Sequence, residues 1–233
     1  MVLRKIVTLF LILLLCIGSF SIPPGIPVSD KYRIDTLENI IYNSLSYNLS
    51  AIEKIDICLE LSDLHSSQSY EKQIEYAARA LILAEERGET GYIIESLKQL
   101  TNAYHNLDNY EKAIEYSTRL YSIYNSRKNE IEAGKALRSI GNSYYGWSKF
   151  VESNDYLHRA LDIFKKNQYF EGVALTLRDI ARILGHWGEY DEALNKNQEA
   201  LKFWEEIGDM EGTASAYNNI GSLYKELGNL DNA

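Results

Sequence analysis

The segment Leu137-x-x-Ile140-Gly141-x-x-Tyr144 has counterparts at one fixed spacing along the chain. These counterparts are Leu97-x-x-Leu100-Thr101-x-x-Tyr104, Leu177-x-x-Ile180-Ala181-x-x-Leu184 and Tyr217-x-x-Ile220-Gly221-x-x-Tyr224. A column of large residues shares the spacing (Tyr110, Phe150, Tyr190 and Leu230), and so does a column of small residues (Ala113, Ser153, Ala193 and Ala233). A fixed period of this length is typical of stacked supersecondary units, because each unit buries its apolar face only against its neighbours. Such stacks bind other molecules more often than they catalyse reactions.

Each repeat divides into two amphipathic helices. In the third repeat, one helix face carries Leu137, Ile140, Tyr144 and Trp147 at three-to-four spacing, and the polar pair Ser148-Lys149 follows as a turn. The second helix then carries the apolar residues Phe150, Leu157, Ala160, Leu161 and Phe164. Gly188 and Gly228 stand where helix ends favour a positive φ. All three prolines precede residue 28, so no strong helix breaker interrupts the repeats.

The small residues within the helices predict close helix packing. Gly141, Ala181 and Gly221 are expected to let an antiparallel partner helix approach. The large residues at positions 97, 100, 137, 140, 177 and 180 are expected to fill the space between helices. Glycine within a helix costs up to about 1 kcal/mol relative to alanine. Its recurrence at one phase of the repeat therefore indicates a packing role.

These columns resemble the tetratricopeptide repeat. The family pattern is matched by Leu137, Ile140-Gly141, Tyr144, Phe150, Ser153, Leu157 and Ala160, and by Leu177, Ile180-Ala181, Leu184, Tyr190, Ala193 and Ala200. Ser117 and Asn197 depart from it, since a large residue is usual at their position. The period, about 40 residues, resembles the longer-helix variant of the family. The resemblance implies an all-α fold, a right-handed α-solenoid of stacked antiparallel helical hairpins (the TPR superhelix).

The sequence predicts four regions. They are a signal peptide (1–21), a linker (22–32), an N-terminal capping helix region (33–53) and the repeat array (54–233). The array holds about 4.5 repeats: 54–93, 94–133, 134–173, 174–213 and the incomplete 214–233. The capping helix is expected from about 33 to 45, where Ile34, Leu37, Ile40 and Ile41 form one apolar face.

The N-terminus has the pattern of an export signal. Arg4 and Lys5 precede an apolar run, and Ser19-x-Ser21 fits a cleavage site. The protein is therefore expected to be exported to the periplasm or outside the cell, with an uncleaved membrane anchor as the alternative. A lipoprotein anchored at Cys16 is disfavoured, because Leu15 stands where a small residue is expected. Cleavage would leave Cys58 alone, so no internal disulfide is expected.

The C-terminus stops at the first core position of a second helix, Ala233. Tyr217, Ile220 and Tyr224 would lack the partner helix that buries them. The pattern therefore favours a fragment of a longer protein, with a naturally shortened protein as the alternative.

Composition and motifs argue against several functions. The formal net charge of −9 disfavours binding to nucleic acid, whose phosphates demand a basic surface. The four histidines have no metal-ligand spacing on one helix, and no phosphate-binding loop or nucleophile elbow is present. We therefore predict no catalytic residues, no metal and no cofactor. Most Asp and Glu residues are expected at solvent-exposed helix positions.

The resemblance implies that the first helix of each repeat lines a concave groove. The groove positions are rich in basic and amide groups: Lys98, Asn102, His105, Lys135, Arg138, Asn142, Tyr145, Arg178, Arg182 and Asn218. Charged donors in a partly desolvated groove favour carboxylates. The pairs Lys98 with Asn102 and Arg138 with Asn142 resemble half of the carboxylate clamp of some family members, but Ser139 and Asp179 break the other half. The alternative is a solvated row that forms salt bridges with neighbouring acids.

The sequence thus predicts a protein- or peptide-binding scaffold that is not an enzyme, with a partner that is acidic or bears a carboxylate. Contact with a membrane is expected only through an uncleaved signal or a missing C-terminal segment. A second hypothesis is the extracytoplasmic sensor region of a bacterial signalling protein that continues into a histidine kinase, a cyclase or a DNA-binding regulator. A third is a hydrolase built on the repeat scaffold.

Overall fold

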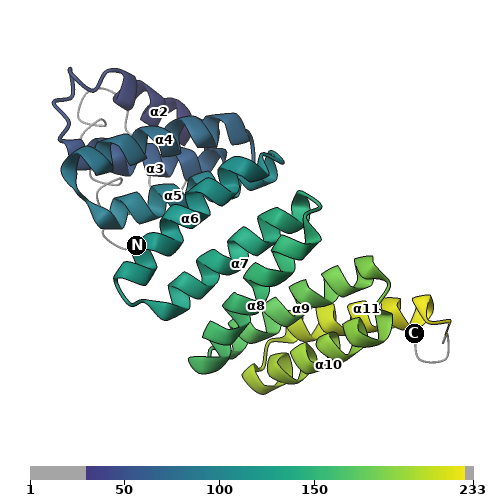
Figure 1. Ribbon diagram of the computed structural model, residues 1–233. Coiled ribbons are helices and arrows are strands. Elements are labelled where there is room, and N and C mark those ends of the chain that lie inside the picture. Colours follow the sequence, from purple (N-terminus) through teal and green to yellow (C-terminus); the bar gives the residue numbers. More distant parts are fainter. Residues whose placement is uncertain (1–29, 229–233) are drawn as a thin grey trace. The chain divides into compact units, whose positions relative to one another are not determined.

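The computed structural model describes residues 30–228, and this range contains ten α-helices and no β-strand (Figure 1). The helices are α2 (Asp30–Tyr42), α3 (Ala51–His65), α4 (Tyr70–Arg87), α5 (Thr90–Asn106), α6 (Tyr110–Ser126), α7 (Glu130–Gly146), α8 (Phe150–Lys166), α9 (Phe170–Trp187), α10 (Tyr190–Ile207) and α11 (Met210–Glu226). The predicted signal, most of the predicted linker, Leu230 and Ala233 lie outside the described residues.

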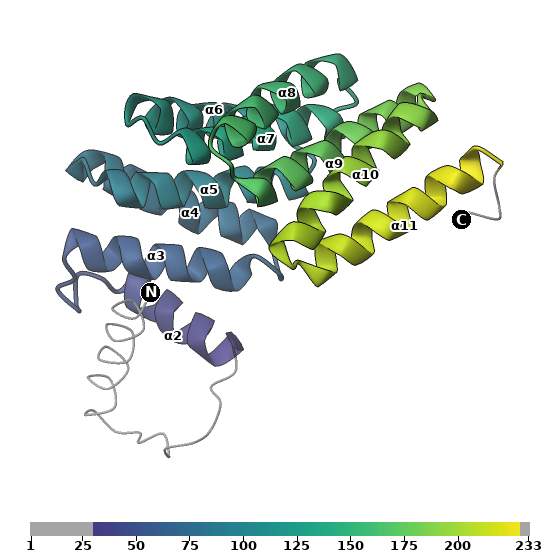
Figure 2. The ribbon, with the colours of Figure 1, turned by 90° about the horizontal axis from the view of Figure 1, so that it is seen from below.

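The described residues form two compact units, which divide between Gln99 and Leu100. In the first unit, α3 and α4 form a hairpin, and α2 packs on α3. In the second unit, consecutive antiparallel helices pack on one another from α6 to α11. Figure 2 shows α9 and α10 as such a hairpin, with α11 following.

The turns between helices recur at regular intervals, two to each repeat. A residue with positive φ stands at Gly88, Asp108, Lys128, Ser148, Gln168, Gly188, Gly208 and Gly228. The backbone around Ser148 is typical: Ser148 N donates to the Tyr145 carbonyl at 2.9 Å, and Lys149 N donates to the Tyr144 carbonyl at 2.9 Å. This pair of bonds is the Schellman motif, which satisfies the last carbonyls of a helix. The prediction at Gly188 and Gly228 is confirmed, and four turns adopt the same geometry without glycine.

The packing role predicted for Gly141 is confirmed. A Cβ added at Gly141 would lie 2.9 Å from Leu157 Cδ2 and 3.3 Å from the Ser153 carbonyl oxygen. Ser153 Oγ donates a 2.8 Å hydrogen bond to the Gly141 carbonyl, so the two small residues bring α7 and α8 together. Large residues fill the core around this crossing, and Leu137, Ile140, Leu177 and Ile180 are all buried.

Trp147 corrects the sequence-based expectation. The pattern places it on the apolar face of its helix, but it is the C-cap residue of α7 and is 41% exposed. Its ring instead lies under the ammonium of Lys149, at 3.5 Å from the ring centre. The helix ends at Gly146, before the pattern of apolar residues does, because the turn begins at Trp147.

In the first unit, α2 begins and ends three residues earlier than the sequence pattern indicated, and it buries Ile34, Leu37, Ile40 and Ile41. Glu38 of α2 accepts hydrogen bonds from Lys72 Nζ and Tyr76 Oη, each at 2.8 Å. Burial acts to raise the pKa of Glu38, but these two bonds lower it overall. Cys58 is fully buried, and this burial raises the pKa of its thiol to about 11, so it is a core residue rather than a reactive one.

Candidate ligand-binding face

Three arginines of the second unit converge on one buried carboxylate. The Asp179 side chain is 1% exposed. Its Oδ2 accepts from Arg138 Nε at 2.7 Å and from Asn142 Nδ2 at 3.3 Å. Its Oδ1 accepts from Arg178 Nη2 at 3.4 Å, and Arg182 Nη1 lies 3.6 Å from the same oxygen. This arginine cluster therefore contains three positive charges and one negative charge.

The repeat period explains why these groups meet. Arg138 and Asn142 lie four residues apart on α7, and Arg178 and Arg182 are their counterparts on α9. A buried carboxylate needs charged or hydrogen-bonding partners, and Asp179 has both. The arginine side chains themselves are 22%, 28% and 45% exposed, in sequence order. The cluster thus presents positive charge to solvent, while the buried carboxylate of Asp179 holds the guanidinium groups on their protein-facing side.

Aromatic rings extend the arginine cluster along α7 and α9. The Arg182 guanidinium carbon lies 4.1 Å from the centre of the Tyr145 ring, which is within cation–π range. The Tyr145 hydroxyl and His186 Nε2 form a 2.6 Å hydrogen bond. His186 in turn stacks on Phe150, with ring centres 4.7 Å apart. Tyr145, supported by His186 and Phe150, therefore provides the surface on which the Arg182 head group rests.

His105 lies beside this face. Its Nδ1 is 3.3 Å from Ser143 Oγ on α7, and its ring packs edge-on against Tyr110. Burial lowers the pKa of His105, and the positive charge of Arg182 lowers it further, against the opposing effect of Asp108. The ring is therefore neutral at pH 7, and it can donate or accept a hydrogen bond but adds no charge.

The other predicted site residues lie outside the arginine cluster. Lys98 is exposed in the first unit, and Asn102 is exposed further along the same helix, α5. Lys135 Nζ pairs with Glu132 at 2.7 Å and lies 5.2 Å from the Tyr169 ring centre. Asn218 is exposed on α11. The structure therefore brings Arg138, Asn142, Tyr145, Arg178 and Arg182 into one contact network and leaves these four residues outside it.

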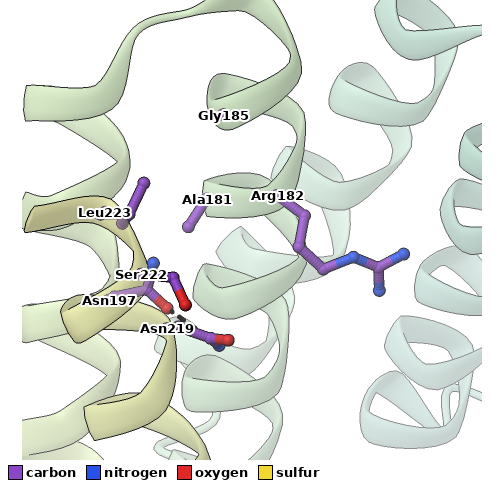
Figure 3. A pocket seen from close by; sticks show the side chains of 7 residues that line it. All are labelled: Ala181, Arg182, Gly185, Asn197, Asn219, Ser222 and Leu223. Carbon is purple, nitrogen blue, oxygen red and sulfur yellow. Dashed lines mark hydrogen bonds between the residues drawn. The ribbon is translucent and has the colours of Figure 1, made fainter. Parts of the chain in front are cut away.

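A cavity of about 170 Å³ lies on the other side of α9, between α9 and α11 (Figure 3). Ala181, Gly185 and Leu223 form apolar walls. Asn197 of α10, Asn219 and Ser222 supply polar groups, and the stem of Arg182 lies at the edge. Asn219 Nδ2 donates to Asn197 Oδ1 at 3.4 Å.

Sequence reasoning missed Asp179 and this cavity. Acidic residues were expected in solvent, yet Asp179 is buried at the centre of the arginine cluster. The signal was present, because Asp179 stands next to Arg178 and one turn before Arg182 in a row already recognised as basic. The signal for the cavity was Asn197, which replaces the large residue that the repeat pattern favours.

Two further features bear on function. Within residues 30–228, no group of three or more His, Cys, Asp or Glu side chains is placed to hold a metal ion. In the same range, none of the helices combines the length and apolar character needed to cross a bilayer.

Comparison with known proteins supports the repeat assignment. Models of the tetratricopeptide repeat match residues 96–127 and 172–233. These two stretches are tetratricopeptide repeats. The sequence matches none of the curated proteins with which it was compared.

Several solved structures share the fold. The apo form of RapI is similar with a TM-score of 0.72 and 19% identity, over 87% of this chain and 76% of RapI. A Rap protein complexed with competence and sporulation factor gives 0.60 and 14%, over 88% of this chain and 67% of that one. A signal transduction ATPase with a tetratricopeptide repeat sensor, from Pyrococcus horikoshii, gives 0.69 and 14%, over 82% of this chain but 30% of the ATPase. At such identities the similarity establishes the fold alone, and the predicted all-α solenoid is confirmed.

Proposed function

We propose that this protein is a binding scaffold for an acidic peptide or protein segment, which it holds at the arginine cluster. The observation that carries the proposal is the set of three partly exposed guanidinium groups around one buried carboxylate. Asp179 balances one of the three charges, so the cluster has a positive surplus within a chain of net charge −9. An acidic ligand would complete this balance through charge-assisted hydrogen bonds.

The geometry leaves donors for such a ligand. Arg138 contacts Asp179 through Nε, so its two terminal nitrogens still carry N–H groups that can bind a carboxylate. Arg182 is 45% exposed and is held against Tyr145, which reduces the entropy lost when a ligand binds. The Rap protein complexed with competence and sporulation factor gives a precedent for ligand binding by a protein of this fold.

Titration with a defined acidic peptide tests the proposal. The probe is Ac-Glu-Glu-Gln-Glu-Glu-NH2, and calorimetry gives its affinity for the wild type and for Arg178→Gln with Arg182→Gln. We expect a loss of at least about tenfold, since each hydrogen bond from a charged donor contributes about 1.5–3 kcal/mol. The matched control is Arg159→Gln, because Arg159 is exposed on α8 and pairs only loosely with Asp155 at 3.9 Å. Equal affinity in both variants, or no saturable binding to the wild type, would overturn the proposal.

A sensor role within a longer signalling protein is the second proposal. It is supported by the similarity to the ATPase whose repeats are described as a sensor, in which this chain corresponds to 30% of the length. Export through residues 1–21 belongs to the same proposal. Sequencing of the gene beyond codon 233 tests the sensor role, and a stop codon there contradicts it. Mass spectrometry of the mature N-terminus tests export, and an N-terminus that retains Met1 contradicts it.

A further inference from the structure

The cavity between α9 and α11 differs from the equivalent place in the preceding repeat. One repeat earlier, between α7 and α9, larger side chains stand at the equivalent positions. The residues at the same positions of that earlier repeat are Leu157 in place of Asn197, Arg182 in place of Ser222 and Tyr145 in place of Gly185. Three smaller residues thus stand at these positions around the cavity, beside Ala181 and Leu223.

Gly185 has no structural need to be glycine. Its φ is not positive, and a Cβ added there would meet no atom within 4 Å. By contrast, Gly134, Gly141, Gly172 and Gly212 face neighbours that a Cβ would strike. Glycine within a helix costs up to about 1 kcal/mol relative to alanine. The cost at Gly185 is offset by no packing gain, and, unlike Gly91, Gly185 lines the cavity, where a glycine lets a ligand approach the backbone.

The polar end of the cavity can recognise an amide. Asn197 is 3% exposed, and its Nδ2 donates to the Ala193 carbonyl at 3.0 Å while its Oδ1 accepts from Asn219. A side-chain amide has two N–H groups and an oxygen with two lone pairs. Among residues 30–228, the hydrogen bonds of Asn197 and Asn219 leave each amide with capacity to bond a further group. Ser222 Oγ donates to the Asn218 carbonyl and can still accept.

The size of the cavity fits one side chain. A cavity of about 150 Å³ accommodates a molecule as large as benzene, and this one measures about 170 Å³. Its apolar walls suit a methylene stem, and its amides suit a group that both donates and accepts. Glutamine combines these two properties, whereas a carboxylate would place its charge against the neutral amides of Asn197 and Asn219 and could not donate to them.

We propose that the cavity between α9 and α11 binds a glutamine side chain of the ligand whose acidic residues contact the arginine cluster. This inference rests on the proposed function, and Arg182 connects the two sites. Figure 3 shows its stem at the edge of the cavity and its guanidinium extending away from the other lining residues. The guanidinium reaches Tyr145 and Asp179 on the α7 side. A peptide that crosses α9 would therefore meet the cavity and the arginine cluster with neighbouring residues.

The first experiment tests the cavity without any acidic group. Butyramide, which carries the amide and methylene stem of glutamine, is titrated into the labelled protein, and the Nδ2 signals of Asn197 and Asn219 are followed by NMR. We expect saturable shifts of both signals. Gly185→Leu should abolish the shifts because leucine fills the mouth of the cavity. Gly91→Leu is the matched control, since Gly91 is also helical, faces open space and lies in the first unit.

The second experiment joins the two sites. Peptides Ac-Glu-Glu-X-Glu-Glu-NH2 with glutamine, methionine or alanine at X are compared by calorimetry. We expect glutamine to bind about three- to tenfold more tightly than methionine, which has a similar length but lacks the amide hydrogen bonds. In Gly185→Leu the three peptides should bind equally, while Gly91→Leu should keep the wild-type order.

The outcomes separate the two proposals. Acidic peptides that bind with no dependence on X, and butyramide that leaves both asparagine signals unshifted up to its solubility limit, overturn the glutamine site and leave the arginine cluster standing. Butyramide binding that Gly185→Leu abolishes, together with no peptide binding, supports the cavity and overturns the proposed function. Methionine binding as tightly as glutamine shows a purely apolar pocket and contradicts the proposal.

Discussion

The two sides of α9 carry different side chains at equivalent positions of the repeat. Towards α7, the space between neighbouring first helices contains Tyr145, Asp179 and the arginines. Towards α11, the equivalent space contains Gly185, Asn219 and a cavity of about 170 Å³. Both are built on the same helix positions of successive repeats. The two sides differ in the side chains at these equivalent positions, so the repeat scaffold supports two kinds of surface chemistry.

The comparison also shows what holds each side together. The α7 side depends on the buried charge of Asp179, whose partners come from two helices. Ion pairs and directional hydrogen bonds therefore stabilise it. The α11 side depends on an amide pair, and space remains around it. Ser117 and Ser139 form the corresponding pair one repeat before the arginine cluster, with their hydroxyls 3.2 Å apart. In successive repeats, this pair of positions therefore holds two serines, then Leu157 with Asp179, then two asparagines.

The largest effect is expected from removing the charge on the α7 side. Asp179→Asn keeps the shape but leaves three guanidinium groups without a counter-charge. We expect the free energy of unfolding to fall by about 2–4 kcal/mol, because breaking a buried ion pair by removing one partner costs more than the pair contributes. Urea denaturation of the wild type and the variant measures this change in the free energy of unfolding. Asp155→Asn is the control, since its side chain is 69% exposed, and it should change stability by less than about 1 kcal/mol. Equal losses in the two variants would show that the cluster is not structural.

The next effect concerns the close crossing of α7 and α8. Gly141→Ala places a Cβ 2.9 Å from Leu157, and we expect a loss of about 1–3 kcal/mol from overpacking. The counterpart Ala181 is tolerated because Asn197 replaces Leu157. A double-mutant cycle with Leu157→Ala measures the coupling, and Gly141→Ala should cost less in that background. Additive effects would mean that Leu157 is not what excludes the methyl group.

Two glycines of α9 should respond in opposite directions. Gly185→Ala should stabilise the protein by up to about 1 kcal/mol, since it gains helix propensity and meets no neighbour. Gly172→Ala should destabilise it, because the added Cβ would lie 2.8 Å from Phe164 Cγ. Thermal unfolding of both variants gives the answer. If Gly185→Ala lowers the melting temperature, the glycine has a packing role and the argument for an open cavity fails.

The smallest effect is a pH dependence at His105, which occupies the column of Tyr145 and Gly185. The folded-state pKa of His105 is lowered by burial and by Arg182. The unfolded chain therefore binds the proton more readily, and stability falls as the pH decreases from the ordinary pKa of about 6.5 towards the folded value. Melting temperatures at about pH 7.5 and about pH 5.5 should differ less in His105→Gln than in the wild type. His158→Gln, on the exposed face of α8, should keep the wild-type difference.

Much of the fold was predictable because its determinants are local and repeated. Leu137, Ile140 and Gly141 appear at one phase in successive repeats, and a helix pair is the structure that buries such a pattern. Turns with glycine at Gly188 and Gly228 were also predictable. Those at Lys128 and Gln168 were not, since neither residue favours a positive φ, and the Schellman bonds of the preceding helix impose it.

The candidate site was only half predictable. Its basic residues follow from two groove columns, one with Arg138 and Arg178 and the other with Arg182. Whether Arg138 faces solvent or an internal acid depends on the side chain that the neighbouring helix α9 presents, and that side chain is Asp179. The cavity depends in the same way on Asn197 and Gly185 at once, and these two residues lie on different helices.

The sequence by itself determined the helices, their pairing and the positive row, because hydrophobic period and residue type act within one helix or between equivalent positions. Only the tertiary structure decided that Asp179 is buried among arginines and that a cavity separates α9 from α11. The physical reason is that burial and free volume are properties of several side chains packed together. No single column of the repeat contains that information.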